Sequence, residues 1–289
     1  MRYSTVDHKG VRSVVVERDD GLYPLDGVED LGEALRDGDP RDLVAAATAL
    51  DPLAVTPVAP LRPGKIVAVG LNYLDHVREA GAELPSAPLL FAKFPSCVIG
   101  DGAPIELDVD LTQRVDWEVE LAVVISRPTR DVATADALDH VFGYTVGNDI
   151  SARDLQFGDG QWVRGKSLDT FCPLGPRVVT GDELGDPQDL RLTTRVNGEL
   201  VQDSSTASMI FGVAELIAFC SRCFTLEPGD VILTGTPWGC GDFMDPPRHL
   251  HPGDVVEVEI QGIGKLTNPV SQRAPVKERA PLPRSRSRP

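Results

Sequence analysis

Residues 114–125 read Arg-Val-Asp-Trp-Glu-Val-Glu-Leu-Ala-Val-Val-Ile, an acidic segment that runs directly into an apolar one. Its β-branched and aliphatic residues predict a strand, in which Glu118 and Glu120 point to the same face because side chains alternate. Two buried carboxylates repel each other unless a cation neutralises them. A third acid, Asp149, would complete an all-oxygen site of the kind that suits Mg²⁺, Mn²⁺ or Ca²⁺. The alternative is that both glutamates lie on the solvent face of an amphipathic strand.

The rest of the chain is also richer in strand patterns than in helix patterns. β-branched runs bounded by Gly and Pro predict strands, and the helical patterns between them follow no regular alternation of strand and helix. We therefore expect an α+β, mainly β fold, a mixed and rolled β-sheet and not a doubly wound one. The expected strands are residues 65–69, 121–125, 190–196, 230–233 and 254–260, and the expected helices are residues 134–142, 151–156 and 209–223.

Composition shifts divide the chain into three parts. Residues 1–60 are expected to form a small α+β module, with a hairpin at 11–25 and short helices at 31–35 and 41–47. Prolines 52, 57, 60 and 63 mark a connector before the main domain, residues 61–272. The tail, residues 273–289, is basic and rich in proline, so we expect it to be disordered.

Charge and cysteine content exclude several classes of function. The net charge is −16; six basic residues against one acidic residue make the tail +5, which leaves −21 for residues 1–272. An acidic body repels nucleic acid and anionic membranes, so neither is an expected partner. No apolar run approaches the roughly 18 residues that span a bilayer, and the first residues lack a signal-peptide pattern, so we expect a cytoplasmic protein. Five scattered cysteines argue against a disulfide framework, and the Cys220–Cys223 pair of a bare CxxC pattern is expected to pack in the core.

His76 and Glu79 are spaced three apart in Leu-Asp-His-Val-Arg-Glu, a pattern that predicts a short helix. On a helix the two side chains share a face, and the carboxylate would raise the basicity of the imidazole and fix its tautomer. Gly81 and Pro85 follow closely, so residues 72–86 are expected to form a mobile lid. The alternative is an ordinary surface His–Glu contact of little consequence.

Two further segments carry residue types that suit a site. Lys166 lies among apolar and turn residues, and it is either a buried charge paired with an acid or a cation that faces a developing oxyanion. Residues 232–241 run from a strand into a glycine-rich loop whose spacing matches no nucleotide-binding pattern. That loop is either a cradle of backbone N–H groups for a substrate carboxylate or a plain hairpin turn.

These segments together resemble the fumarylacetoacetate hydrolase family, specifically its smaller bacterial and mitochondrial branch. The resemblance covers about residues 62–270 and is specific because separate motifs recur in the same order. The motifs are GLNYLDHVREA (70–80), RVDWEVELAVVI (114–125), GYTVGNDISARDLQ (143–156), RGKSLDTFCPLGP (164–176), VNGELVQDSSTASMIF (196–211) and PGDVILTGTPWGCG (228–241).

The resemblance implies roles for residues at matching positions. Glu118, Glu120 and Asp149 would bind a divalent metal, Mg²⁺ or Mn²⁺, with Ca²⁺ able to replace it in crystals. His76 and Glu79 would be the catalytic dyad on a lid, and Lys166 would support the oxyanion. Arg153, Gln156 and Thr236 match positions that line the substrate site. Family members are commonly homodimers, so a homodimer is expected.

One departure from the family pattern concerns the substrate. Fumarylacetoacetase proper carries an additional Asp metal ligand seven residues before its catalytic His, whereas this chain has Val69 there. Fumarylacetoacetate is therefore not the expected substrate.

The sequence predicts a metal-dependent hydrolase that cleaves a carbon–carbon bond in a short 2,4-dioxo acid of the acylpyruvate type. A water activated by His76 and Glu79 would attack the distal carbonyl, and cleavage would leave an enolate. The alternative is an isomerase or decarboxylase that acts on an unsaturated dioate or on oxaloacetate with the same metal site. A third hypothesis is a non-catalytic metal-binding scaffold, which turnover of any acylpyruvate would exclude.

Overall fold

The computed structural model describes residues 1–274, and within them the chain folds into two β-sheets and a short pair of strands. The large sheet contains β1 (Arg2–His8), β2 (Val11–Arg18), β3 (Gly21–Pro24), β4 (Thr56–Val58), β5 (Ile66–Gly70), β6 (Leu89–Lys93), β7 (Val98–Ile99), β10 (Val119–Ile125), β11 (Val141–Asn148), β13 (Cys172–Thr180) and β16 (Val231–Leu233). The smaller sheet contains β8 (Ile105–Leu107), β14 (Arg191–Val196), β15 (Glu199–Ser205), β17 (Val255–Ile260) and β18 (Gly264–Gln272). The short pair is β9 (Val115–Asp116) and β12 (Ser151–Ala152).

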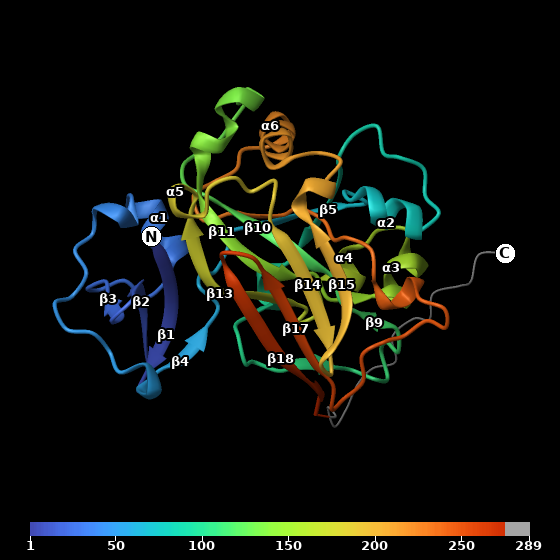
Figure 1. Cartoon of the computed structure of the whole chain (residues 1–289), viewed down its shortest axis with the longest axis horizontal. Helices are drawn as coiled ribbons and strands as arrows, with labels where there is room; N and C mark the ends of the chain where they lie inside the picture. Colours follow the sequence, from blue (N-terminus) through green and yellow to red (C-terminus); the bar gives the residue numbers. More distant parts are fainter. Residues whose placement is uncertain (275–289) are drawn as a thin grey trace.

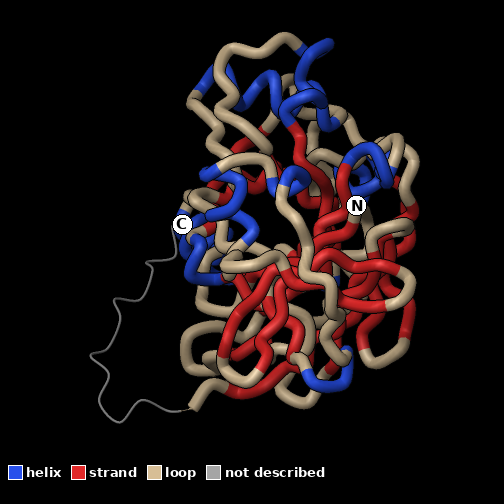
Figure 2. The backbone as a smooth tube through the Cα atoms, turned by 90° about the vertical axis from the view of Figure 1, so that its left-hand side faces the viewer, coloured by secondary structure: helices blue, strands red, loops and turns tan. Residues whose placement is uncertain are grey.

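The helices are short and lie around the sheets. They are α1 (Leu31–Asp37), α2 (Leu74–Glu79), α3 (Arg153–Asp159), α4 (Val163–Lys166), α5 (Gly181–Leu184) and α6 (Val213–Cys223). In Figure 2 most of the helical turns lie above the strands. The predicted mainly β class with mixed sheets is confirmed, since β5 pairs with β16 in parallel while β10 pairs with β11 antiparallel.

The two sheets pack face to face and enclose the core. Strands β14, β17 and β18 pack against β10, β11 and β13, which form the middle of the large sheet (Figure 1). All seven residues of β10 are buried, because the strand has neighbours on both edges and protein on both faces. A charged residue in this strand therefore lies inside the protein, which excludes the solvent-face alternative for Glu120.

The first residues join the large sheet through β1, which pairs with β13 at Arg2↔Val179. The predicted hairpin is confirmed as β2 and β3, and the predicted helix at 31–35 is confirmed as α1. The predicted helix at 41–47 is wrong. Asp39 caps a single 3-10 turn that ends at Asp42, and Ala45 then forms a β-bridge with Leu25, so the backbone is extended there. The predicted disordered tail lies, apart from its first two residues, outside the described residues.

Three predicted helices differ at their ends or in type. Residues Thr134–His140 form 3-10 turns, and Ser151 and Ala152 pair with β9, so α3 begins only at Arg153. Helix α6 begins at Val213, because Met209 forms a β-bridge with Tyr73. At Ser151 and at Met209 a long-range backbone pairing replaces the helical hydrogen bonds that local sequence favours. On α6, Cys220 is buried as predicted, whereas Cys223 is exposed, which corrects the expectation of core packing for the second cysteine.

Candidate active site

Three carboxylates meet where β10 and β11 run side by side. Glu118 precedes β10, Glu120 lies within it, and Asp149 follows the last residue of β11. The antiparallel register places Asp149 opposite Glu118, and the Asp149 N–H donates to the Glu118 carbonyl at 2.9 Å. The three residues are at most 4% exposed, and one oxygen from each lies within 4.8 Å of the others. The sequence prediction that these acids share one space is confirmed geometrically.

Three cations neutralise Glu118 and Asp149. The Lys166 ammonium lies between them, 2.5 Å from Glu118 Oε2 and 2.7 Å from Asp149 Oδ2. Lys93 donates to Asp149 Oδ1 at 2.7 Å, and the Arg153 guanidinium lies 2.6 Å from Glu118 Oε1. Burial raises the pKa of Glu118, but Arg153 and Lys166 outweigh burial and lower that pKa to about 2. Of the two readings of Lys166, the structure therefore shows the buried charge paired with acids.

Glu120 is different, because no ion pair reaches it within residues 1–274. Its Oε2 accepts one backbone hydrogen bond, from Gly235 N–H at 2.8 Å. Burial, and then the charges of Asp149 and Glu118, raise the pKa of Glu120 well above its ordinary value. An ionised Glu120 thus requires a further cation at this point of the cluster.

The donor set fits a hard divalent cation. Three buried carboxylates that converge, one of them with no cationic partner, match the oxygen ligands that Mg²⁺ and Mn²⁺ prefer. Glu118, Glu120 and Asp149 would each supply one oxygen. The sequence-based expectation of Mg²⁺ or Mn²⁺ therefore agrees with the chemistry of the site, and the choice of metal remains a proposal.

His76 and Glu79 face each other on α2, as the three-residue spacing predicted. His76 Nδ1 lies 3.0 Å from Glu79 Oε2, and the imidazole packs edge-on against Phe243 with ring centroids 5.3 Å apart. Glu79 Oε1 accepts the Gly239 N–H at 2.8 Å, so both oxygens of this carboxylate are held. A carboxylate beside Nδ1 accepts a hydrogen bond from the Nδ1–H group. The other ring nitrogen, Nε2, is then unprotonated and can accept a proton. His76 is buried and the Glu79 side chain is only 15% exposed, which excludes the alternative of an ordinary surface contact.

The glycine-rich loop after β16 binds the protein's own acids. Gly235, Gly239 and Gly241 donate backbone hydrogen bonds to Glu120, Glu79 and Asp116, at 2.8, 2.8 and 2.7 Å respectively. Gly239 has φ +95°, and a Cβ there would lie 2.0 Å from the Val201 carbonyl oxygen, so only glycine fits. These three N–H groups already donate to acidic side chains of the protein, so they cannot bind a substrate carboxylate. The loop instead orients the dyad and the carboxylate cluster.

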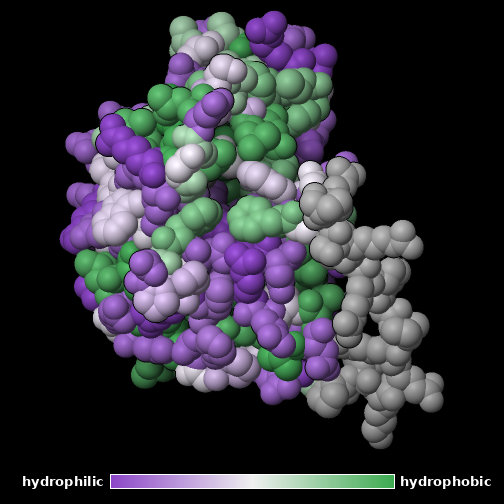
Figure 3. All heavy atoms as spheres, turned by 90° about the vertical axis from the view of Figure 1, so that its right-hand side faces the viewer, coloured by the Kyte–Doolittle hydropathy of each residue, from purple (hydrophilic) through white to green (hydrophobic). Residues whose placement is uncertain are grey.

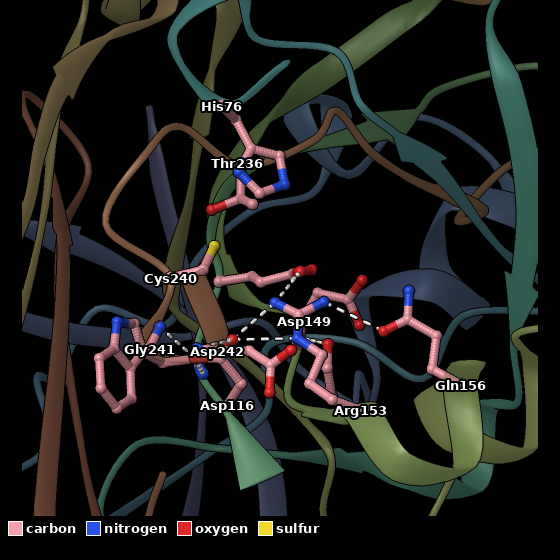
Figure 4. A network of polar contacts seen from close by, with 12 residues as sticks. His76, Asp116, Asp149, Arg153, Gln156, Thr236, Cys240, Gly241 and Asp242 are labelled. Carbon is pink, nitrogen blue, oxygen red and sulfur yellow. Dashed lines mark hydrogen bonds and ion pairs between the residues drawn. The ribbon is translucent and has the colours of Figure 1, made fainter. Parts of the chain in front are cut away.

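Arg153 is held in place by an acid that the sequence analysis missed. Asp116 Oδ2 accepts from Arg153 Nε at 2.9 Å and from Nη2 at 2.8 Å, and Arg153 Nη1 donates to Gln156 Oε1 at 3.0 Å (Figure 4). The sequence carried a signal for Asp116, because the acids at 116, 118 and 120 occupy alternate positions and would share one face of a strand. Lys93, the other missed residue, is the last residue of β6 and carries no local signal of its long-range partner Asp149.

A single cavity joins the dyad to the carboxylates. It has a volume of about 700 Å³ including its open mouth, and His76, Glu118, Glu120, Lys166 and Thr236 line it. Arg153 and Gln156 line it as well, so every predicted substrate residue faces this space. Figure 3 shows the face that carries α2 and α3, where hydrophobic side chains gather in the upper half. Val69 also lines the cavity. At this position, where fumarylacetoacetase carries its additional acid, this chain has an aliphatic side chain.

The remaining wall of the cavity is mostly apolar. Besides Val69 it includes Leu71, Ala80, Ala82, Phe91, Phe157, Trp162 and Phe243. Trp162 packs on Gly70, where a Cβ would lie 2.5 Å from the indole ring. An apolar wall lowers the local dielectric constant and strengthens the interactions between charges inside the cavity.

The arrangement agrees with a comparison against protein families. Residues 65–271 match the model described as fumarylacetoacetate (FAA) hydrolase C-terminal. The chain belongs to the fumarylacetoacetate hydrolase family. It is an enzyme of this family by sequence and by fold, which confirms the resemblance on which the site assignments depend.

The names of curated relatives indicate which reactions those relatives catalyse. The chain is 48% identical over 242 residues to a Bos taurus protein named oxaloacetate tautomerase FAHD2B, mitochondrial, which covers 83% of this chain and 77% of the relative. It is 46% identical over 242 residues to Homo sapiens oxaloacetate tautomerase FAHD2A, mitochondrial, with the same coverage. These names place the relatives in mitochondria, so a cytoplasmic location for this chain stays a prediction. Within residues 1–274 no helix is long and apolar enough to cross a membrane.

Solved structures show the same architecture. A fumarylacetoacetate hydrolase from Exiguobacterium antarcticum superposes with a TM-score of 0.83 at 41% identity, covering 94% of this chain and 100% of the other. A 2-hydroxyhepta-2,4-diene-1,7-dioate isomerase from Mycobacterium marinum gives 0.79 at 36% identity, covering 95% and 100%. The names of the similar proteins therefore include a hydrolase, an isomerase and tautomerases.

Asp116→Asn tests whether this acid positions Arg153. The substitution removes the charge that pairs with a buried guanidinium, so we expect a loss of about 1–3 kcal/mol in the free energy of unfolding and a higher KM. Chemical denaturation and steady-state kinetics measure the two effects. Asp203→Asn is the matched control, because Asp203 makes a bidentate contact with Arg191 on the surface, where about 0–1 kcal/mol is expected. Equal losses in both variants would contradict the positioning role.

Proposed function

We propose that this chain interconverts the keto and enol forms of a short 2-oxo acid, with oxaloacetate as the first candidate substrate. One observation carries the proposal: His76 of the His–Glu pair and Glu118 and Glu120 of the three-carboxylate cluster line the same cavity. Tautomerisation requires a proton acceptor beside carbon 3 and positive charge beside the 2-oxo oxygen, and it needs no water molecule as a reactant. The names of the tautomerase and isomerase relatives support this choice over hydrolysis.

The chain's own residues would move and stabilise the proton. His76 would accept the proton from carbon 3 at Nε2, and Glu79 would stabilise the imidazolium that results. Returning the proton to oxygen or to carbon then completes the change in either direction. Arg153 and Lys166 line the cavity while paired with the acids, and they would add positive charge beside the substrate's carboxylate and developing oxyanion. A divalent cation held by Glu118, Glu120 and Asp149 would act as a Lewis acid that polarises the 2-oxo group.

The cavity wall favours a second candidate, the hydrolysis of a 2,4-dioxo acid, which the sequence alone placed first. Phe91, Phe157 and Trp162 offer more apolar surface than a four-carbon diacid can cover. An acylpyruvate-like substrate would place its tail there, and His76 would then deprotonate a water molecule. Decarboxylation of oxaloacetate needs the same cluster and differs by the release of CO₂.

Substrate assays with Mg²⁺ or Mn²⁺ separate these reactions. We expect the protein to accelerate the decay of the enol absorbance of oxaloacetate without release of CO₂ or pyruvate. In deuterated water the label should enter carbon 3, which proton NMR detects. Because divalent ions alone catalyse changes in oxaloacetate, buffer with metal and without protein is the baseline. Formation of two acids from an acylpyruvate, with ¹⁸O from solvent water in the released acid, would move the assignment to hydrolysis.

A further inference from the structure

Cys240 lies beside the His–Glu pair and has no part in the proposed reaction. One ligand atom each from His76, Glu79 and Cys240 lies within 4.8 Å of the other two. Figure 4 shows the Cys240 sulfur directed to the side of the cavity on which His76 and Thr236 lie. The thiol is fully buried, and its polar contacts, with Pro237 O and Gln202 Nε2, are both 3.8 Å long. It is therefore a thiol with weak partners, next to an imidazole and a carboxylate.

We propose that His76, Glu79 and Cys240 form a second metal site, one that takes Zn²⁺ or a similar thiophilic cation and stops the reaction. Sulfur, nitrogen and oxygen together are the ligands that Zn²⁺ selects, whereas Mg²⁺ binds oxygen and leaves thiols alone. Three protein ligands leave a fourth position for water. His76 lines the same cavity as Glu118 and Glu120, but the two sites differ in chemistry, so each prefers a different cation.

The nitrogen and oxygen of this cluster have a spacing close to the one that Zn²⁺ requires, and the sulfur lies within 4.8 Å of both. Tetrahedral zinc with bonds of about 2.0–2.2 Å to nitrogen and oxygen separates those two atoms by about 3.3 Å. His76 Nδ1 and Glu79 Oε2 are 3.0 Å apart, so these atoms need to separate by only a few tenths of an ångström. Binding at sulfur releases the thiol proton to solvent, because the ligand is the thiolate.

Occupancy of this site has two consequences. A cation at Nδ1 leaves the ring proton on Nε2, so Nε2 can no longer accept the substrate's proton and proton transfer is blocked. It also links α2, which carries His76 and Glu79, to the loop that carries Cys240, so it holds α2 against the cavity. The first consequence rests on the proposed function. Metal binding itself does not, and the experiment below measures it separately.

Cobalt is the probe for binding, because a thiolate bound to Co²⁺ gives an intense near-ultraviolet charge-transfer band and carboxylates do not. The full-length protein is saturated with Mg²⁺ and titrated with Co²⁺. We expect the band to appear, Zn²⁺ to abolish it, and Cys240→Ser to lack it. Cys223→Ser is the matched control, because Cys223 is the exposed cysteine and its loss should leave the band intact. A band that persists in Cys240→Ser, or no band in the wild type, would overturn the site.

Two further measurements distinguish the loss of a ligand from a folding defect, and zinc at this site from zinc at the carboxylate cluster. Glu79→Gln keeps the thiol and should weaken Co²⁺ binding by at least about tenfold, since a ligand is lost. In the Mg²⁺-dependent assay, Cys240→Ser should need at least about tenfold more Zn²⁺ for half-inhibition than the wild type. Equal sensitivity would place the inhibiting zinc at the three carboxylates and overturn the inhibitory role. If no substrate is turned over, the proposed function is wrong. The cobalt spectra still test the metal site, because they do not depend on turnover.

Discussion

Replacing His76 with alanine is expected to lower kcat by about 10²–10⁴-fold, the range that a positioned general base contributes. The imidazole is buried, held by Glu79 at 3.0 Å and packed on Phe243, so its orientation is set before substrate binds. Removing it takes away the group that would accept the proton and leaves the three carboxylates in place. Steady-state kinetics gives the loss, and calorimetric titration with Mn²⁺ should show unchanged stoichiometry.

Two companion variants sharpen this result. Glu79→Gln keeps the shape of the dyad but removes the charge that stabilises an imidazolium, so kcat should fall by less than in His76→Ala. His251→Ala is the matched control, because His251 is exposed and does not line the cavity. If His76→Ala retains full activity, the base is another residue. If it loses Mn²⁺ as well, the imidazole holds the metal and the two roles must be reassigned.

The sequence predicts the framework of the fold because its strands carry strong local signals. The run from Leu121 to Ile125 is apolar and β-branched, and it becomes a central strand buried on both faces. The helix expected at 41–47 does not form, because Ala45 in this alanine-rich segment pairs with Leu25 in a β-bridge. Helix propensity is a weak preference that a tertiary backbone contact overrides.

The same limit applies to the site. Glu118 and Glu120 could be paired from strand alternation, and His76 and Glu79 from helical spacing, because both patterns are local. Lys93 reaches Asp149 across 56 positions of the chain, and Cys240 reaches His76 through a loop from a different part of the sheet. No periodicity encodes such contacts, so they emerge only when the strands are assembled.

Glu118→Gln and Glu120→Gln are each expected to weaken Mn²⁺ binding by at least about 100-fold and to abolish measurable metal-dependent turnover. Each substitution removes one of three converging carboxylate ligands, and losing even an outer-shell partner costs about 10–100-fold in affinity. Calorimetry with Mn²⁺ and metal analysis after dialysis measure the loss. Glu257→Gln is the control, since that glutamate pairs with Lys265 on the surface. Full metal occupancy in either site variant would place the metal elsewhere.

The two variants should change the stability of the metal-free protein in opposite directions. Glu118 neutralises Lys166 and Arg153, so the amide leaves two buried cations with less compensation and should cost roughly 1–3 kcal/mol in the free energy of unfolding. Glu120 has no cationic partner in the described residues, and its raised pKa means that ionising it opposes folding. A raised pKa in the folded state makes this destabilisation grow as the pH rises above the unfolded value. Glu120→Gln should therefore stabilise the metal-free protein at neutral pH.

Chemical denaturation of chelator-treated protein at neutral pH and near pH 5 tests this difference. We expect the gain in Glu120→Gln to shrink at the lower pH, where the wild-type carboxylate is protonated, while added Mn²⁺ should stabilise the wild type and leave both variants unchanged. Opposite signs would show that the cluster, counted with Asp116, keeps one acid in excess of its three internal cations, at the expense of stability. That excess is what a divalent cation neutralises, so the feature that destabilises the metal-free protein is the one that gives the site its affinity. Two losses of equal size would instead mean that Glu120 has a cationic partner in solution, and the argument for a metal at this cluster would lose its electrostatic basis.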